Sequence, residues 1–269
     1  MARIKLISWN VAGKIGKSEA QADALAAFAP DLVALQEVRP GAADKLRLLL
    51  PKIGLGNVLD TKSRRHPERQ HRGVLIASRW PIEELPQQIP VPFRERSLSV
   101  RVGAPMKPME LHTVHVPPGS GNGWIKIETL EAVFDALSQP SKLPRILCGD
   151  FNSPQAETSN GVVITWGQRI RSDGTVTIGA KRGRRWDTGE RNVIVGLSSH
   201  GFVDVFRHLN GYTANDTSWR QKWRHLPGYR PDHIFASAEL HPTACRYLHA
   251  LREQGLSDHS PIEAEFSGV

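Results

Sequence analysis

The chain has 269 residues, of which 39% are hydrophobic and 23% are charged, as in an ordinary globular protein. No stretch approaches the roughly 20 apolar residues of a membrane span, and two cysteines are too few for a disulfide framework or a cysteine-rich zinc site. The N-terminus has no apolar run of signal-peptide length, so we expect a cytoplasmic protein with no membrane partner. The net charge of +8 favours a polyanionic partner.

Strands and helices alternate through the first part of the chain. The predicted elements are, in order, a strand at 3–11, a helix at 18–30, a strand at 31–38, a helix at 42–53, and strands at 73–82, 96–102 and 108–116. Ser18 is the expected N-cap of the first helix, and Pro30 ends it. The last three strands follow one another closely, so we expect them to be antiparallel neighbours.

The rest of the chain predicts one long helix, further strands and a polar segment. A helix is expected at 123–139, with an apolar stripe that packs in the core, and strands are expected at 145–150, 230–240 and 260–266. The polar, glycine-rich segment at about 155–200 shows only strand-like fragments. Buried strands in both halves predict an α/β fold in which two sheets pack face to face with helices outside. We expect one domain over 1–269, with 155–200 as a polar basic insertion.

Positive charge is concentrated in three segments, at 61–72, 169–191 and 217–231. The third segment holds four Lys or Arg residues and no acid, interleaved with Trp219 and Tyr229. Aromatic rings among cations are typical of surfaces on which nucleobases stack. The alternative is that the three segments are solvated loops of a basic protein.

Polar side chains recur at the ends of otherwise apolar strands. They are Asn10, Glu37, His115, Asp150, Asn152, Asp232, Asp258 and His259. Strand ends of layered sheets gather at one rim, where sites collect. Oxygen ligands without a thiolate suit a hard cation such as Mg²⁺ or Mn²⁺, and histidines beside carboxylates suit hydrolysis of a phosphate ester. One such residue alone is usually a cap or turn former, and this alternative stays open for Asn10.

The sequence resembles the endonuclease/exonuclease/phosphatase superfamily, which includes exonuclease III-type abasic-site endonucleases and pancreatic-type deoxyribonucleases. The motifs that carry the resemblance are "SWNV", "LVALQEV", "TVHVPPG", "CGDFNSP", "RPDHIFAS" and "LSDHSPI", in the family's order, over residues 8–262. The resemblance implies a four-layer α/β sandwich and metal-dependent cleavage of phosphoesters.

The resemblance also implies a role for each residue at the strand ends. Glu37 matches the principal metal ligand, with Asn10 beside it, and Asp258 matches the acid on the metal side. The implied cofactor is Mg²⁺ or Mn²⁺.

Four further residues match the family's catalytic positions. Asp150 matches the residue that orients or deprotonates the attacking water, and Asn152 the residue that supports the phosphate. His259 matches the histidine that bonds the scissile phosphate, with Asp232 holding its imidazole. The sequence leaves open whether Asp150 or His259 is the general base.

The residues around these motifs bear on the substrate. Abasic-site endonucleases typically have Tyr at the position of His115, whereas a histidine there resembles the deoxyribonuclease and phosphatase branches, in which it can protonate the leaving oxygen. Trp219 resembles the tryptophan that lines the pocket for an extruded sugar, although a core position is the alternative. Candidates for phosphate contacts, any of which could equally be surface charge, are Lys126, Arg220, Arg224 and Arg230.

Several substrate classes remain open at this stage. Charge and aromatic content favour a DNA-directed endonuclease or exonuclease, acting on nicks, ends, abasic sites or intact strands. RNA, or a small or lipid phosphoester, is the alternative substrate, and a non-catalytic binding module is disfavoured because every site residue is present. The segment at 155–200 is interpreted as an arm over DNA or a solubilising loop. We expect a monomer.

Overall fold

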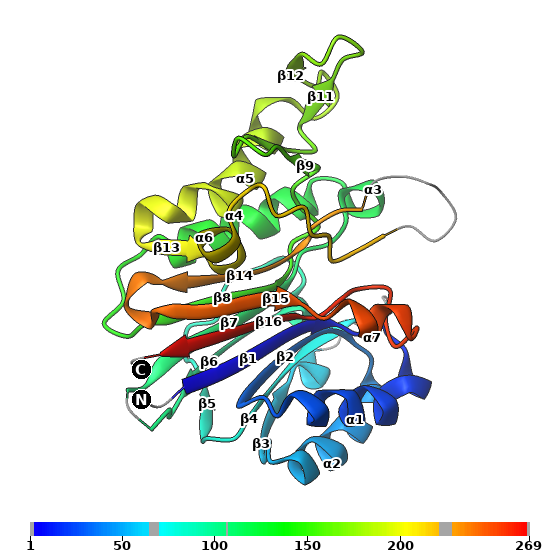
Figure 1. Cartoon of the computed structure of the whole chain (residues 1–269), viewed down its shortest axis with the longest axis vertical. Helices are drawn as coiled ribbons and strands as arrows, with labels where there is room; N and C mark the ends of the chain where they lie inside the picture. The colour runs from blue at the N-terminus through cyan, green and yellow to red at the C-terminus, as the bar shows by residue number, and fades with distance from the viewer. Residues whose placement is uncertain (1–2, 65–69, 106, 221–227, 268–269) are drawn as a thin grey trace.

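The computed structural model describes residues 3–64, 70–105, 107–220 and 228–267, and it folds them into two six-stranded mixed sheets that pack face to face (Figure 1). The first sheet has the order β15 (Pro242–Tyr247), β16 (Ile262–Ser267), β1 (Arg3–Asn10), β2 (Leu32–Val38), β4 (Gly73–Ser78) and β3 (Asn57–Asp60). The second has the order β13 (Phe202–Asp204), β14 (Asp232–Ser237), β8 (Arg145–Asp150), β7 (Met109–His115), β6 (Ser97–Val102) and β5 (Ile82–Glu84).

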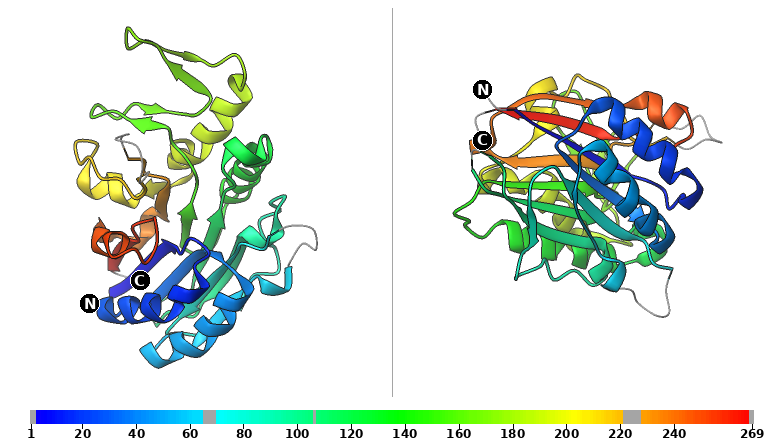
Figure 2. Two further views of the ribbon diagram at one scale, coloured as in Figure 1. Left: turned by 90° about the vertical axis from the view of Figure 1, so that its right-hand side faces the viewer. Right: turned by 90° about the horizontal axis from the view of Figure 1, so that it is seen from below.

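Helices cover the outer faces of both sheets. Helices α1 (Ser18–Phe28) and α2 (Pro40–Leu49) lie on the first sheet, and α4 (Ile125–Leu137) and α5 (Gly183–Ile194) on the second (Figures 1 and 2). Three short helices are α3 (Gly119–Asn122), α6 (Val205–Asn210) and α7 (His249–Glu253). The predicted four-layer α/β sandwich is thus confirmed.

The apolar core has three layers because the central strands are buried on both faces. In β1, Leu6 points into the layer between the sheets, whereas Ile7 points toward the helices of the first sheet. In β8, Ile146 and Cys148 face the other sheet, whereas Leu147 packs under α4 and α5. Successive side chains of a strand point to opposite faces, so a strand buried on both sides needs the continuous apolar run that the sequence shows.

Three expectations about the elements are wrong in detail. Strand β4 pairs with β2 and β3 in the first sheet, and only β6 and β7 of the expected antiparallel trio are neighbours. Ser18 is the first residue of α1 and not its N-cap, and its hydroxyl donates to the carbonyl of Ile15. Trp124 was expected to pack in the core as part of the 123–139 helix. In the structure it precedes α4 and is 42% exposed.

The segment at 155–200 contains a helix where only strand-like fragments were expected. Helix α5 packs against α4 through Trp186, Val193 and Ile194, which belong to the core layer outside the second sheet. Gly189 permits this close approach, since a Cβ there would lie 2.8 Å from a methyl carbon of Ile127. Polar residues and glycines dominate the rest of α5, which is why its composition indicated a loop.

Four short strands make up the remainder of that segment. Strand β9 (Ala156–Glu157) pairs with β10 (Val163–Ile164), and β11 (Gln168–Ile170) pairs with β12 (Val176–Ile178). The β11–β12 hairpin extends away from the sandwich, beyond α5 (Figures 1 and 2). The segment at 155–200 therefore joins the core through α5 and projects from the body through this hairpin.

Candidate active site

The topology brings the polar strand ends together at one edge of both sheets. Strands β1, β7 and β8 end at Asn10, His115 and Asp150, and Glu37 is the penultimate residue of β2. Strand β14 runs antiparallel to β8 and begins at this same edge, with Asp232 opposite Asp150. Strand β16 runs antiparallel to β1, so the residues before it reach this edge as well.

Two irregular backbone positions aim the site residues. Glu37 has a φ of 57° at a register shift in β2, and such a bulge redirects a side chain out of the regular alternation. Gly149 has a φ of 142°, and a Cβ there would lie 1.9 Å from the carbonyl oxygen of Val114 in the neighbouring strand. The glycine before Asp150 is therefore required by the close approach of β7.

Asp150 is the most densely contacted carboxylate of the site. Its Oδ2 accepts a hydrogen bond from Asn10 Nδ2 at 2.8 Å, and its Oδ1 accepts one from the backbone N–H of Asn152 at 2.9 Å. Burial, followed by the charge of Asp232, raises the pKa of Asp150 to about 7 against the opposing effect of these donors and of His259. The carboxylate is thus held in one orientation.

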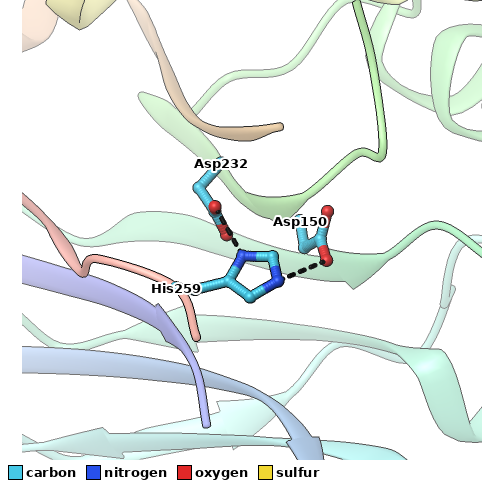
Figure 3. Close-up of side chains that lie close together, drawn as sticks. All are labelled: Asp150, Asp232 and His259. Carbon is cyan, nitrogen blue, oxygen red and sulfur yellow. Dashed lines mark hydrogen bonds and ion pairs between the residues drawn. The ribbon is translucent and has the colours of Figure 1, made fainter. Parts of the chain in front are cut away.

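His259 and Asp232 form a hydrogen-bonded pair beside Asp150 (Figure 3). Nδ1 of His259 lies 2.8 Å from Asp232 Oδ2, and Nε2 lies 3.9 Å from Asp150 Oδ2. Burial would lower the pKa of His259, but the charge and hydrogen bond of Asp232, helped by Asp150, raise it to about 10. The pair therefore presents an imidazolium at neutral pH.

Glu37 has basic partners on both of its oxygens. Its Oε1 lies 3.5 Å from His115 Nε2, and its Oε2 accepts a hydrogen bond from Arg72. His115 is 1% exposed, and burial, followed by the charges of Arg96, His259 and Arg72, lowers its pKa well below the usual range. His115 is therefore neutral at neutral pH.

A cavity of about 220 Å³ connects these groups to the surface. Its wall includes five of the predicted catalytic and metal-binding residues, namely Glu37, Asp150, Asn152, Asp258 and His259, and also the predicted substrate contact Trp219. Among the described residues of its lining, Asn10, His115 and Asp232 are absent, since all three lie deeper in the fold. The structure thus brings the predicted catalytic and metal-binding residues together but places three of them behind the others.

The oxygen donors of this site fit a hard divalent cation. Glu37, Asp150 and Asp258 supply carboxylates and Asn152 an amide, with no thiolate among them. The Oδ1 atom of Asp232 is buried without a hydrogen-bond partner among the described residues. One ligand atom each of Asp150, Asp232 and His259 lies within 4.8 Å of the others, so this group is a second candidate for the metal.

A second, larger pocket of about 390 Å³ adjoins the first. The two share Pro118, Asn152, Trp166, Trp219 and Tyr229 as lining residues. Trp219 also links the site to this pocket, since its Nε1 donates to Asp258 Oδ2 at 3.2 Å. We call this second space the aromatic pocket; its lining also includes Lys126, Arg182 and Trp186.

The residues predicted to contact phosphate differ in their burial and in their hydrogen-bond partners. Lys126 is buried in the wall of the aromatic pocket, with its ammonium bonded to Glu190 and to the carbonyl oxygen of Asn152. Arg220 is exposed, and its Nε donates to Thr217. Arg224 lies outside the described residues.

Arg230 is a correction to the sequence-based expectation. It is 4% exposed, and its guanidinium is paired with the carboxylates of Glu157 and Asp204. Its charge is directed into the protein, so it is a structural ion-pair residue and not a phosphate contact.

Sequence analysis missed Arg72, Trp166 and Glu190. Arg72 was counted within a basic segment, and its pairing with Glu37 depends on the fold around it. Trp166 and Glu190 lie in the polar segment at 155–200. A tryptophan is unusual in such a polar stretch, and this was the one available signal.

Residues 7–259 match the sequence model of the endonuclease/exonuclease/phosphatase family, which is most of the chain. The chain belongs to this family. Members of the family are metal-dependent phosphoester hydrolases, and the predicted family is thus confirmed. Comparison with the sequences of curated proteins finds no match.

Solved structures of the family share the fold. The AP endonuclease from Archaeoglobus fulgidus superposes with a TM-score of 0.73 at 20% identity, covering 98% of this chain and 100% of that one. TDP2 of D. rerio, complexed with a single-strand DNA product, gives 0.69 at 19% identity and covers 100% of both chains. A family protein from Beutenbergia cavernae gives 0.70 at 17% identity, covering 99% of this chain and 72% of that one.

None of the helices in the described part of this family member combines the length and apolarity needed to cross a bilayer.

Proposed function

We propose that the protein is a divalent-metal-dependent phosphodiesterase that hydrolyses DNA. The observation that carries the proposal is the cavity in which Glu37, Asp150, Asn152, Asp258 and His259 meet, next to the aromatic pocket. A phosphodiester flanked by nucleosides combines a negative charge with planar groups. The catalytic cavity suits the charged phosphate, and the aromatic pocket suits a planar base.

His259 binds the scissile phosphate in this proposal. Asp232 bonds Nδ1 of the imidazole and thereby fixes its orientation, leaving Nε2 to donate to a phosphate oxygen. A preorganised donor of this kind stabilises the charge that develops on phosphorus-bound oxygens in the transition state. Asn152, held by its contact with the carbonyl oxygen of Val116, supports the phosphate from the neighbouring strand end.

Asp150 orients the attacking water and accepts its proton. Each of its oxygens receives one hydrogen bond, from the side chain of Asn10 and from the backbone of Asn152, so the carboxylate cannot rotate freely. Asn10 uses both ends of its amide within the protein, since its Oδ1 accepts the Ala12 N–H. We therefore assign Asn10 to the positioning of Asp150, in place of the metal contact that the sequence suggested.

Glu37 and Asp258 would hold the Mg²⁺ or Mn²⁺ ion. When bound, the ion stabilises negative charge on the phosphate as a Lewis acid. These two residues are preferred over the Asp150–Asp232–His259 group because both line the cavity that the phosphate would enter, whereas Asp232 lies behind it. His115, buried and 3.5 Å from Glu37, orients this carboxylate and does not protonate the leaving oxygen.

DNA is the preferred substrate class for three reasons. The chain carries a net charge of +8, aromatic side chains adjoin the site, and the solved relatives include an AP endonuclease and a TDP2 bound to single-strand DNA. RNA or a small phosphoester is the alternative outcome of the test.

Cleavage of end-labelled oligonucleotides in Mg²⁺ or Mn²⁺, with EDTA as the control, tests the proposal. The substrates are single-stranded DNA, duplex DNA, a duplex with one abasic site, and RNA of the same sequence. We expect metal-dependent cutting of at least one DNA substrate, and a loss of about 100-fold or more in Asp150→Asn, because a positioned base contributes about that much.

Each outcome has a consequence for the substrate. Cutting restricted to the abasic duplex identifies a repair endonuclease, and cutting of RNA alone overturns the DNA assignment. No cutting of any substrate in either metal refutes the proposed function.

A further inference from the structure

The aromatic pocket is lined by planar rings and cations. The rings of Trp166 and Tyr229 lie with centroids 5.5 Å apart, and those of Tyr229 and Trp219 are stacked at 5.8 Å with an interplanar angle of 29°. The same pocket is lined by Arg182 and Trp186, and the Arg182 guanidinium lies 4.5 Å from the centroid of the Trp186 ring. Such a lining suits a flat, electron-rich group that is attached to an anion.

A buried carboxylate fixes the walls of this pocket. Glu190 is fully buried; its Oε1 accepts hydrogen bonds from Trp186 Nε1 and Lys126 Nζ, both at 2.7 Å. Its Oε2 accepts the backbone N–H of Trp166 at 2.8 Å. Three wall residues from two separate parts of the chain are therefore tied to one side chain.

The same network connects the pocket to the catalytic cavity. Lys126 Nζ also donates to the carbonyl oxygen of Asn152 at 2.8 Å, and Asn152 lines both spaces. Arg182 Nη1 donates to the carbonyl oxygen of Trp166 at 2.8 Å. The pocket is thus preformed at a fixed position relative to the site of phosphate cleavage, and preformed sites lose little affinity to ordering.

We propose that the segment at 155–200 builds a nucleobase subsite from Trp166, Arg182 and Trp186, and that the substrate presents an unpaired nucleotide next to the scissile phosphate. The inference rests on the proposed function and names its substrate class. A pocket of about 390 Å³ is large enough for one base with its sugar. A base within a duplex is stacked and paired, so it enters such a pocket only from a single strand, a frayed end or an extruded position.

Two single-stranded substrates of equal length test this subsite. One is ordinary DNA, and the other has the same phosphodiesters but a tetrahydrofuran residue in place of every nucleoside. We expect wild-type kcat/KM to be about 10-fold higher on ordinary DNA, since stacking of a base on an aromatic side chain contributes a factor of about this size. The same sequence in a blunt duplex is cut about 10-fold more slowly than the single strand, because the base must first be unpaired.

The variant Trp166→Ala isolates the stacking contribution. Because Trp166 also lines the catalytic cavity, the test compares the two substrates: we expect kcat/KM to fall about 10-fold more on ordinary DNA than on the base-free chain. Trp166→Phe keeps a stacking face and retains most of the activity. The matched control is Trp124→Ala, which removes an exposed tryptophan that contacts Trp186 but is not among the described residues lining the pocket.

Arg182→Gln is the second variant, in case the wall around position 166 does not tolerate alanine. It removes the cation over Trp186, and we expect it to reduce the preference for ordinary DNA by a few-fold. Equal wild-type rates on the two substrates, or an equal loss on both in Trp166→Ala, overturn the subsite but leave the phosphodiesterase intact. If the wild-type protein cuts neither substrate in Mg²⁺ or Mn²⁺, the proposed function has failed and the subsite fails with it.

Discussion

Glu37 and Asn152 adopt left-handed backbone conformations, with φ values of 57° and 50°. A residue other than glycine in this region costs on the order of 1–3 kcal/mol, and the surrounding structure must hold it there. At Glu37 the support comes from Gln36, whose Nε2 donates to Ser8 in β1 and to Thr113 in β7. The strained position thus sits where the two sheets are joined, and its side chain is directed into the cavity.

Replacing Glu37 with Gln tests its assignment to the metal. The substitution keeps the size of the side chain but removes the negative charge, so we expect metal-dependent hydrolysis to fall by about 100-fold or more. The protein should remain folded, with a Tm within a few degrees of wild type. Cleavage rates across a Mg²⁺ titration, together with circular dichroism, measure both effects. Glu83→Gln, at an exposed position in β5, is the control, and an unchanged rate in Glu37→Gln removes Glu37 from the metal site.

The close backbone contact at Gly149 predicts that adding a side chain there lowers the unfolding free energy. An alanine Cβ at this position would lie 1.9 Å from the Val114 carbonyl oxygen, and φ is 142°. The clashing atom belongs to the backbone of β7 and cannot move aside as the end of a flexible side chain can. We therefore expect Gly149→Ala to lose about 3 kcal/mol or more of unfolding free energy. Gly16→Ala is the matched control, since no atom lies within 4 Å of its added Cβ, and it should stay within about 0.5 kcal/mol of wild type. Urea denaturation distinguishes the two, and equal midpoints contradict the packing argument.

At the scale of elements, central strands such as β1, β2 and β8 could be predicted because they are buried on two faces and their sequences are continuously apolar. Asn10, Glu37 and Asp150 could be recognised for the same reason, as polar residues that end such runs. The edge strands β3, β13 and β15 were not predicted, since they are short or partly exposed. Helix α5 could not be recognised, since Arg, Asp and Glu outnumber its apolar residues and its buried face includes Gly189 and Glu190. Burial of Glu190 depends on Lys126, which lies in another helix, and no local pattern reports a partner so distant in sequence.

A buried ion network fastens β9 and α6 to the start of β14. Glu157 accepts hydrogen bonds from Arg207 and Arg230, and Asp204 contacts both Arg230 and His233. Burial would raise the pKa of Glu157, but the charge of Arg230 and the hydrogen bonds from Arg230 and Arg207 lower it to about 2. The network therefore stabilises the fold only while this carboxylate is ionised.

The pH dependence of stability follows from this lowered pKa. A group with a lowered pKa in the folded state contributes its full stability above its ordinary pKa, and loses it as the pH falls toward the folded value. We expect Glu157 to contribute roughly 3 kcal/mol above pH ~4.5 and to lose this contribution between pH ~4.5 and ~2. Urea unfolding of wild type and Glu157→Gln across that range measures the difference. The variant should be less stable at neutral pH, because two buried arginines lose a partner, and the gap should close as the pH falls. A gap that is constant with pH contradicts the assignment.

At the scale of the whole molecule, the site belongs to neither sheet alone. Asn10, Glu37 and His259 come from the first sheet and its connections, whereas His115, Asp150 and Asp232 come from the second. The hydrogen bond from Asn10 to Asp150 and the contact of His259 with Asp232 both cross between the sheets. Any movement of one sheet over the other therefore separates His259 from Asp232 and Asn10 from Asp150, so the geometry of the candidate site depends on the packed core between the sheets.

The net positive charge of the molecule leads to a test that distinguishes an enzyme acting on nucleic acid from a phosphatase of small substrates. With a net charge of +8, binding of single-stranded DNA should release counterions at each phosphate contact. For about five contacts, the affinity of the Asp150→Asn protein for a labelled oligonucleotide should fall about 100-fold between roughly 50 and 200 mM salt. Hydrolysis of a small phosphodiester by the wild-type protein should change by less than about twofold over the same range, since it engages the catalytic cavity and not the extended surface. Fluorescence anisotropy measures the first quantity and absorbance the second. A salt-independent affinity for DNA would mean that the positive surface does not contact the substrate backbone, and the preferred substrate would then be a small phosphoester.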